Sequence, residues 1–200
     1  MIPSRLVRTV PRETSDEVEA YWAHATALHP TWQHVTLRDP VDPAGFPHTR
    51  HLWGTCESGA QLADLIRAEY LYWHGGVYLD SDVEVYRSFQ PLMVNEGFAA
   101  WEDERHIPNA VMGFEKGHPA LSEVIKLAVE RHFDGTWAAG VGVTTEVFTG
   151  RDDMLLLPPD SFYPYHYSFK DAYQTTQARE RVKAAHPWAF CAHHWRHSWK

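Results

Sequence analysis

Two aspartates flank a serine at Asp80-Ser81-Asp82, directly after the apolar run Val77-Tyr78-Leu79. The run predicts a short buried strand, and ligands of open α/β sheets bind beyond the carboxyl ends of such strands. Two carboxylates one residue apart in a turn can converge on one hard cation, directly or through water. That cation would bridge a diphosphate and neutralise the charge that develops on a leaving group. By itself, the tripeptide fits a solvated acidic turn better than a metal site, so its context must decide.

Asp64 and Arg67 precede the acidic turn on Ser58–Trp73, the stretch that predicts the clearest helix of the chain. Because they stand three positions apart, both side chains project from one face of that helix. A carboxylate there can accept two sugar hydroxyls, and a guanidinium can reach a hydroxyl and a phosphate oxygen. The plain alternative is a weak ion pair within the helix.

The elements that must position these residues alternate between short apolar segments and amphipathic ones, which predicts an α/β protein. Strands are predicted over residues 5–10, 33–37, 77–79, 83–86, 98–101, 110–114 and 154–157. Helices are predicted over residues 14–28, 58–73, 119–132 and 171–185. Gly75-Gly76 ends the second helix, because glycine accepts the left-handed conformation that a helix C-terminus commonly needs.

Length and composition limit the classes of function. The 200 residues predict a single domain over residues 1–200. The formal charge of −8 argues against a large cationic surface for nucleic acid or anionic lipid. The two cysteines, Cys56 and Cys191, suit a reduced chain better than a disulfide framework. The sequence shows no signal-peptide pattern and no membrane-length apolar stretch, so we expect a cytoplasmic protein.

The run from Ala63 to Val83 resembles the signature of the DXD-type sugar transferases of glycosyltransferase family 32. That family includes fungal initiating mannosyltransferases and glycolipid α-1,4-galactosyltransferase. Its pattern is Ser-Asp-x-x-Arg-x-x-x-Leu-x-x-x-Gly-Gly-Ile-Tyr-x-Asp-x-Asp, and here Ala63 replaces the serine and Val77 the isoleucine. The spacing over some twenty residues makes this a far more specific signal than the bare acidic tripeptide.

Looser similarity to the same family extends over most of the chain. The similar blocks are Ile2-Pro3, His29-Pro30-Thr31-Trp32, Ile107-Pro108-Asn109-Ala110, Gly117-His118-Pro119, Leu157-Pro158, Phe162-Tyr163-Pro164 and His193–Trp199. Two positions depart from the family pattern: Val7 stands near the place of a usual histidine, and Val141 stands where proline is usual.

The resemblance implies an α/β fold of the GT-A type, a Rossmann-like nucleotide-sugar transferase fold with a mixed central sheet flanked by helices. It implies a metal-dependent transferase that moves a sugar, most simply a hexose, from a UDP- or GDP-sugar to the hydroxyl of a glycan, lipid or other acceptor. It also implies retention of the anomeric configuration. Because no second carboxylate is evident as a nucleophile, a same-face mechanism is expected, with the leaving phosphate taking the acceptor proton.

The resemblance also implies roles for individual residues. Asp80, through water, and Asp82 hold the metal together with a histidine of the tail, for which His193 is favoured and His194 is the fallback. A nitrogen ligand beside carboxylates favours Mn²⁺ over Mg²⁺. Asp64 and Arg67 hold the donor sugar.

Four more residues are candidate substrate contacts: Tyr78, Asn109, Ser198 and Trp199. For Tyr78 a place in the core is the plain alternative, and for Asn109 an exposed loop. For the histidine-rich tail the alternative is an exposed chain end.

Three other functions stay open at this point. A catalytically idle nucleotide-sugar-binding module is suggested by Val7 and Val141. A metal-dependent phosphohydrolase would use the same carboxylates. A transferase with a nucleic-acid acceptor is disfavoured by the net charge, without being excluded by it.

Overall fold

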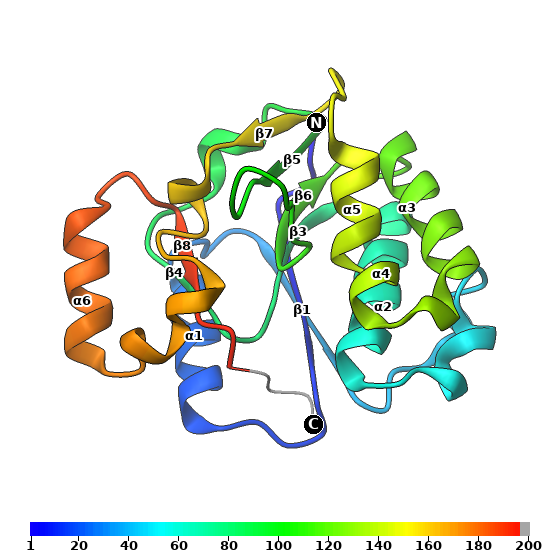
Figure 1. Ribbon diagram of the computed structural model, residues 1–200, viewed down its shortest axis with the longest axis horizontal. Helices are drawn as coiled ribbons and strands as arrows, with labels where there is room; N and C mark the ends of the chain where they lie inside the picture. Colours follow the sequence, from blue (N-terminus) through cyan, green and yellow to red (C-terminus); the bar gives the residue numbers. More distant parts are fainter. Residues whose placement is uncertain (197–200) are drawn as a thin grey trace.

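The computed structural model describes residues 1–196 and is built around a mixed six-stranded sheet. Its strands are β1 (Arg5–Val10), β2 (Gln33–Arg38), β3 (Gly76–Leu79), β5 (Gly97–Ala100), β6 (Val111–Phe114) and β7 (Leu155–Leu157), in the order β2-β1-β3-β6-β5-β7 (Figure 1). Strand β6 runs antiparallel to both of its neighbours, and the other pairs are parallel. The mixed central sheet expected from the sequence is therefore confirmed.

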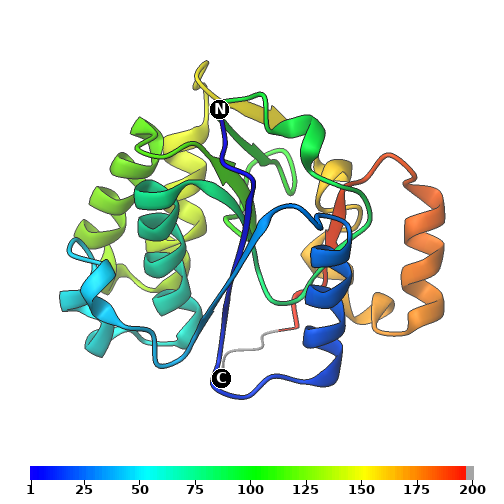
Figure 2. The same cartoon turned by 180° about the vertical axis from the view of Figure 1, so that it is seen from behind.

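Helices cover both sides of the sheet (Figures 1 and 2). One side carries α2 (Gly59–His74), α3 (Pro119–Glu130), α4 (Thr136–Ala139) and α5 (Val141–Phe148). The other side carries α1 (Asp16–Ala27), α6 (Thr176–Ala185) and a two-stranded sheet of β4 (Val83–Val85) and β8 (Cys191–His193). Within residues 1–196, no helix combines the length and apolar character needed to cross a bilayer.

Successive residues of the central strands enter two different apolar layers. Leu6 of β1 packs in the layer toward α1, whereas its neighbour Val7 packs in the layer toward α2 and α3. In β3, Leu79 faces the first layer and Tyr78 the second. Because side chains alternate across a strand, a strand covered on both faces is apolar throughout, as this one is.

Helix α2 delivers the chain to the acidic turn. The side chain of Ser58 accepts a hydrogen bond from Gln61 N at 3.2 Å and so caps the first turn. The helix ends at Gly75, whose φ of 65° lies in the left-handed region, and Gly75 N donates to Leu71 O at 2.7 Å. Strand β3 starts at the next residue, so the helix and the strand that precede Asp80 are joined without a loop.

The C-terminal part of the chain returns to the acidic turn through β8. This strand pairs antiparallel with β4, and His193 is the register partner of Val83. The sequence shows too short an apolar segment to predict β8. As a result of this pairing, His193 lies beside Asp82 although more than a hundred residues separate them.

Two further elements differ from the expectation. The helix predicted over 171–185 is divided into a 3-10 turn over Tyr167–Tyr173 and helix α6, because Thr175 caps α6 by accepting from Ala178 N. Helix α5 was not predicted at all. Its glycine and its β-branched residues disfavour a helix, but Val143, Val147 and Phe148 gain burial by forming one.

Gly97 in β5 and Gly113 in β6 leave space for the rings of Phe114 and Phe98, which lie where a side chain would otherwise be. An added Cβ at Gly113 would overlap the ring of Phe98. Gly113→Ala should therefore lower the free energy of unfolding by about 1 to 3 kcal/mol, measured by urea denaturation. Gly54→Ala is the control, because an added Cβ there meets nothing within 4 Å. Equal stability of the two variants would contradict the packing described here.

Candidate active site

A cavity of about 360 Å³ opens beyond the end of β3, between α2 and the C-terminal segment. Six of the residues singled out in the sequence line it: Asp64, Arg67, Asp80, Asp82, Asn109 and His193. They come from α2, from the turn after β3, from the segment before β6 and from β8. The carboxyl end of a strand is where open α/β sheets bind ligands, so this location agrees with the expectation.

The backbone holds the acidic turn in place. Asp80 N donates to Ala110 O at 2.8 Å, and Val83 N donates to Asp80 O at 3.1 Å. The Asp82 carboxylate contacts His193 Nε2 through Oδ1 at 3.1 Å and accepts from Arg196 N through Oδ2 at 2.6 Å. Asp80 Oδ2 lies 3.9 Å from the same His193 nitrogen.

The charges in this cluster favour an ionised carboxylate. Burial alone would raise the pKa of Asp82, but its ion pair and hydrogen bond with His193 outweigh burial, and the pKa is lowered. Conversely, burial would lower the pKa of His193, and the neighbouring Asp82 and Asp80 raise it. The ionised form of Asp82 and the protonated form of His193 therefore stabilise one another.

The donor set fits a divalent cation. One atom each from Asp80, Asp82 and His193 lies within 4.8 Å of the others. Ligands at about 2.1 Å from a small cation lie up to about 4.2 Å apart, so a slight contraction would complete the set. His194 does not join it, because its ring contacts Glu84 Oε2 at 3.1 Å and the Tyr165 hydroxyl at 2.5 Å.

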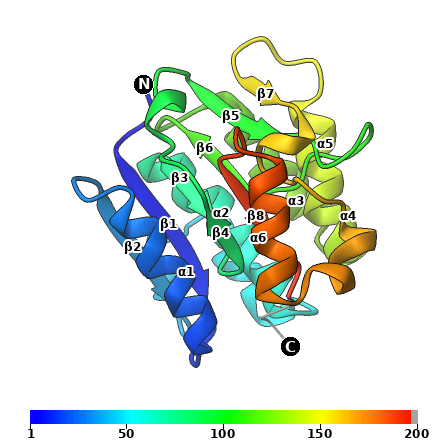
Figure 3. The ribbon, with the colours of Figure 1, turned by 90° about the vertical axis from the view of Figure 1, so that its left-hand side faces the viewer.

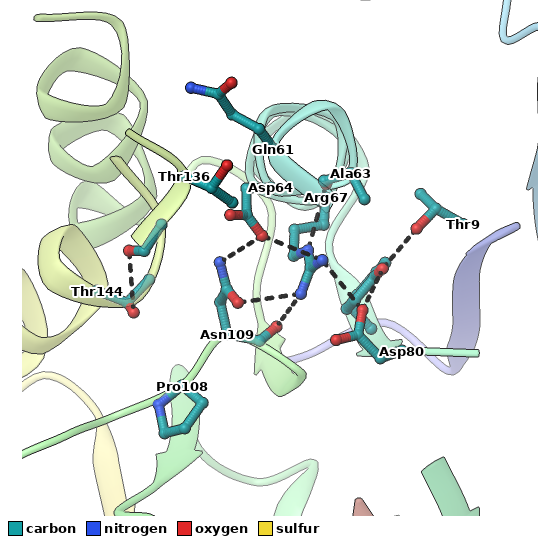
Figure 4. Close-up of polar contacts among 12 residues, drawn as sticks. Thr9, Gln61, Ala63, Asp64, Arg67, Asp80, Pro108, Asn109, Thr136 and Thr144 are labelled. Atoms are coloured by element: carbon teal, nitrogen blue, oxygen red, sulfur yellow. Dashed lines mark hydrogen bonds and ion pairs between the residues drawn. The ribbon is translucent and has the colours of Figure 1, made fainter. Parts of the chain in front are cut away.

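Arg67 connects three walls of the cavity (Figure 4). Its Nη2 pairs with Asp64 Oδ1 at 3.1 Å and with Asp80 Oδ1 at 3.0 Å. Its Nη1 donates to the backbone and side-chain oxygens of Asn109, both at 3.0 Å. The side chain is only 4% exposed. The ion pair within the helix that was the plain alternative does form, as one part of a larger network.

One carboxylate oxygen of Asp64 has polar partners, and the other has none within residues 1–196. Its Oδ1 accepts from Asn109 Nδ2 at 3.0 Å and pairs with Arg67, while its Oδ2 points at Gly140, where any Cβ would overlap it. Burial raises the pKa of Asp64 to about 6, against the opposing effect of Arg67. A carboxylate at this position is available to accept hydroxyl groups near neutral pH.

Comparison with known proteins agrees with this geometry. Residues 15–99 match the family described as glycosyltransferase sugar-binding region containing DXD motif. The matched segment contains Asp64, Arg67, Asp80 and Asp82. The inositol phosphoceramide mannosyltransferase 3 of Schizosaccharomyces pombe is 31% identical over 121 residues, which are 56% of this chain and 34% of the relative. The match thus spans about a third of that curated relative.

Solved structures show the same fold at low sequence identity. The glycosyltransferase PaToxG is 14% identical, with a TM-score of 0.64 over 94% of this chain and 78% of that one. The galactosyltransferase LgtC, solved with donor and acceptor sugar analogues, is 11% identical, with a TM-score of 0.52 over 96% of this chain and 87% of that one. The fold is therefore the expected GT-A type.

Within the DXD segment, Tyr78 lies behind the cavity wall. It is completely buried, and its hydroxyl donates to Asp80 Oδ1 at 2.9 Å and is 2.6 Å from Thr9 Oγ1. The guanidinium of Arg67 lies 4.6 Å from the centre of its ring. This placement suits a residue that orients Asp80 better than one that touches substrate.

Other members of the cavity wall carry little signal in the sequence. Glu102, Trp137 and Trp195 line the cavity, yet no motif singles them out as a group. Glu102 comes directly after the strand predicted over residues 98–101. Val141, one of the two departures from the family pattern, also lines the cavity, whereas Val7 is in the core. Ser198 and Trp199 lie outside the described residues.

The burial of Asp64 predicts a pH dependence of stability. Its pKa of about 6 in the folded chain exceeds the ordinary value of 3.8, so folding favours the protonated form. Stability contributed by the neutral acid is present below pH 4 and is lost as the pH rises through 6, by up to about 3 kcal/mol. Asp64→Asn should remove this part of the dependence, measured by urea denaturation between pH 4.5 and 7.5.

The exposed Asp152 provides the control, because Asp152→Asn should retain the dependence of the wild type. Identical pH profiles for wild type and Asp64→Asn would show that the Asp64 carboxyl is not perturbed.

The hydrogen bond from Tyr78 to Asp80 predicts a change in metal affinity. Tyr78→Phe should weaken Mn²⁺ binding about tenfold, because Asp80 loses the donor that orients it. Calorimetric titration with Mn²⁺ measures the effect. Tyr72→Phe is the matched control, since the Tyr72 hydroxyl makes no hydrogen bond within residues 1–196. Unchanged affinity in Tyr78→Phe would remove Tyr78 from the site.

Proposed function

We propose that this protein is a metal-dependent glycosyltransferase that moves a hexose from a nucleotide-diphosphate donor to an acceptor hydroxyl. The carrying observation is the convergence of Asp80, Asp82 and His193 on one point at the end of β3, in the cavity that Asp64 also lines. Its support is the match of residues 15–99 to the DXD sugar-binding family and the GT-A fold. The mannosyltransferase relative agrees with a hexose donor.

Carboxylates outnumber the basic side chains that line the cavity, which explains why binding of a diphosphate would require a metal. Asp64, Asp80, Asp82 and Glu102 line it, against the single guanidinium of Arg67 and the imidazole of His193. A bare diphosphate would be repelled by this excess of carboxylates. A divalent cation held by Asp80, Asp82 and His193 would offset most of this negative charge and stabilise the leaving diphosphate. The imidazole ligand favours Mn²⁺ over Mg²⁺.

The donor sugar would lie against Asp64. The Oδ2 of this residue is the oxygen that Arg67 and Asn109 leave open, and the missing side chain at Gly140 gives it space. Sugar hydroxyls would donate to it, which orients the anomeric carbon toward the acceptor side of the cavity. Arg67 acts mainly by fixing Asp64, Asp80 and Asn109, because its own hydrogen-bonding groups are already engaged by them.

We assign a retaining, same-face transfer to this site. The acceptor oxygen bonds to the anomeric carbon from the side on which the diphosphate leaves. As the anomeric carbon–oxygen bond breaks, the departing phosphate oxygen takes the acceptor proton. The chain's contribution is to hold donor and acceptor in contact and to exclude water from between them.

Loss of the metal site tests the proposal. Wild type should be stabilised by one of a panel of UDP- and GDP-hexoses in the presence of Mn²⁺, by about 2.7 kcal/mol at 100 times the dissociation constant. Asp82→Asn should abolish that stabilisation, because it removes a buried charged ligand. Thermal unfolding with and without Mn²⁺ measures both. Asp152→Asn, an exposed aspartate, should behave as wild type.

Four outcomes would contradict the proposal. A panel that gives no metal-dependent shift, or an Asp82→Asn variant that keeps the full shift, would remove the metal site. A shift without slow donor hydrolysis would indicate the idle binding module. Release of inorganic phosphate from a simple phosphate ester, with no transfer of sugar, would indicate a phosphohydrolase.

A further inference from the structure

The rim of the cavity carries an exposed tryptophan that the metal and the donor do not use. Trp137 in α4 lines the cavity and is 60% exposed. The edge of its indole lies over Gly142, where an added Cβ would be 3.3 Å from Cζ3. The ring of His106 contacts it edge-on, with centroids 5.8 Å apart. The indole is therefore held by its neighbours while much of its surface faces solvent, which is typical of a ligand platform.

Glu102 is a carboxylate of the same cavity that has no role in the metal cluster. Its side chain is only 11% exposed. Oε1 accepts from Tyr167 N at 3.2 Å, whereas the structure shows no hydrogen bond to Oε2 within residues 1–196. Glu102 lines the same cavity as Asp80, Asp82 and His193. One oxygen of a nearly buried carboxylate thus remains for a ligand.

The loop between β5 and β6, which carries Glu102, contacts both α4 and the segment before the turn over Tyr167–Tyr173. Asp103 Oδ2 contacts His106 Nδ1 at 2.9 Å and His166 Nε2 at 3.4 Å, and Asp103 Oδ1 accepts from His106 N at 2.8 Å. His106 touches Trp137, and His166 precedes the turn over Tyr167–Tyr173. Figure 3 shows α4, this loop and that turn on the right-hand side of the molecule. The contacts of Asp103 and His106 therefore join Trp137 and Glu102 in one surface.

We propose that Trp137 and Glu102 form the acceptor subsite and that the acceptor presents a ring polyol, a hexopyranose or a cyclitol. This inference rests on the proposed function and names the substrate class of the acceptor. The C–H face of the ring packs on the indole, and a hydroxyl of the ring donates to Glu102 Oε2. A linear polyol or a serine side chain offers no flat apolar face to Trp137.

The subsite orients the attacking group without changing chemically. In the transfer, the acceptor oxygen bonds to the anomeric carbon, the bond from that carbon to the diphosphate oxygen breaks, and the proton moves to the diphosphate. Glu102 accepts a hydrogen bond and retains its charge throughout. Its contribution is the alignment of the acceptor hydroxyl.

Direct binding tests the subsite without requiring turnover. Saturation-transfer NMR uses methyl α-mannopyranoside, methyl β-galactopyranoside and myo-inositol as ring probes and glucitol as the linear probe, with Mn²⁺ and UDP or GDP present. At least one ring probe should receive saturation at its ring C–H protons, and glucitol should not. The hexopyranosides and the inositol distinguish the two classes of ring.

Substitutions assign the signal to the rim. Trp137→Ala should reduce it at least fivefold, and Trp137→Phe, which keeps an aromatic face, should recover part of it. Trp188→Ala is the matched control, because Trp188 is 53% exposed but does not line the cavity. An equal signal in Trp137→Ala and Trp188→Ala would overturn the proposal.

Kinetics test the role of Glu102. With the binding ring probe as acceptor, Glu102→Gln and Trp137→Ala should each lower the ratio of sugar transfer to donor hydrolysis at least tenfold. Trp137→Ala should act mainly through the acceptor KM, and Glu102→Gln through kcat. The exposed Glu104 supplies the control, since Glu104→Gln should leave the ratio unchanged.

The outcomes separate this inference from the proposed function. If donor hydrolysis is metal-dependent but glucitol or a serine peptide accepts sugar as well as any ring does, the subsite is wrong and the transferase stands. If no donor is bound or hydrolysed, the proposed function fails, and ring binding seen by NMR still decides whether Trp137 is a polyol platform.

Discussion

The site depends on a single buried guanidinium. Arg67 holds Asp64 on its own helix, Asp80 at the end of β3 and Asn109 before β6, each within 3.1 Å. Taking a guanidinium and two carboxylates out of water costs several kcal/mol per ion, and only close pairing with full hydrogen bonding offsets that cost. Without Arg67, Asp64 and Asp80 would repel one another in a medium of low polarity. The geometry of the donor side of the cavity therefore follows from one side chain.

The two aspartates of the DXD motif have different partners, because Arg67 pairs with only one of them. Asp80 shares its charge with Arg67 and receives a hydrogen bond from Tyr78, so its Oδ1 is already engaged. Asp82 is more deeply buried and is paired with His193. The proposed cation site thus lies between a carboxylate paired with Arg67 and a carboxylate paired with His193.

Sequence patterns predicted the local parts of this arrangement. The capped helix over α2, the glycine that ends it and the apolar β3 follow from short-range chemistry, and their order along the chain places Asp64, Arg67 and Asp80. By contrast, Trp137 and Glu102 share a cavity only because of tertiary packing between α4 and the loop after β5. Tyr78 shows the limit of motif matching, since the alternation of side chains along β3 directs it into the core rather than toward a ligand. Helix α5 shows how burial of Val143 and Phe148 can override poor intrinsic propensity.

With His193 as a ligand of the proposed cation site, metal binding and pairing of β8 with β4 would be a single equilibrium. His193 reaches Asp82 only when β8 pairs with β4, and the same pairing lets Arg196 N donate to Asp82 Oδ2. Trp195 between them adopts a φ of 48°, a conformation that is costly for a residue with a side chain, and its ring packs 4.8 Å from that of His193. A cation held by Asp80, Asp82 and His193, as proposed, would stabilise the paired strand, because it would bind only the docked form. By reciprocity, any contact that favours the docked segment would raise the affinity for the metal to the same extent. Strand β8 would therefore be as much a part of the proposed cation site as the carboxylates themselves.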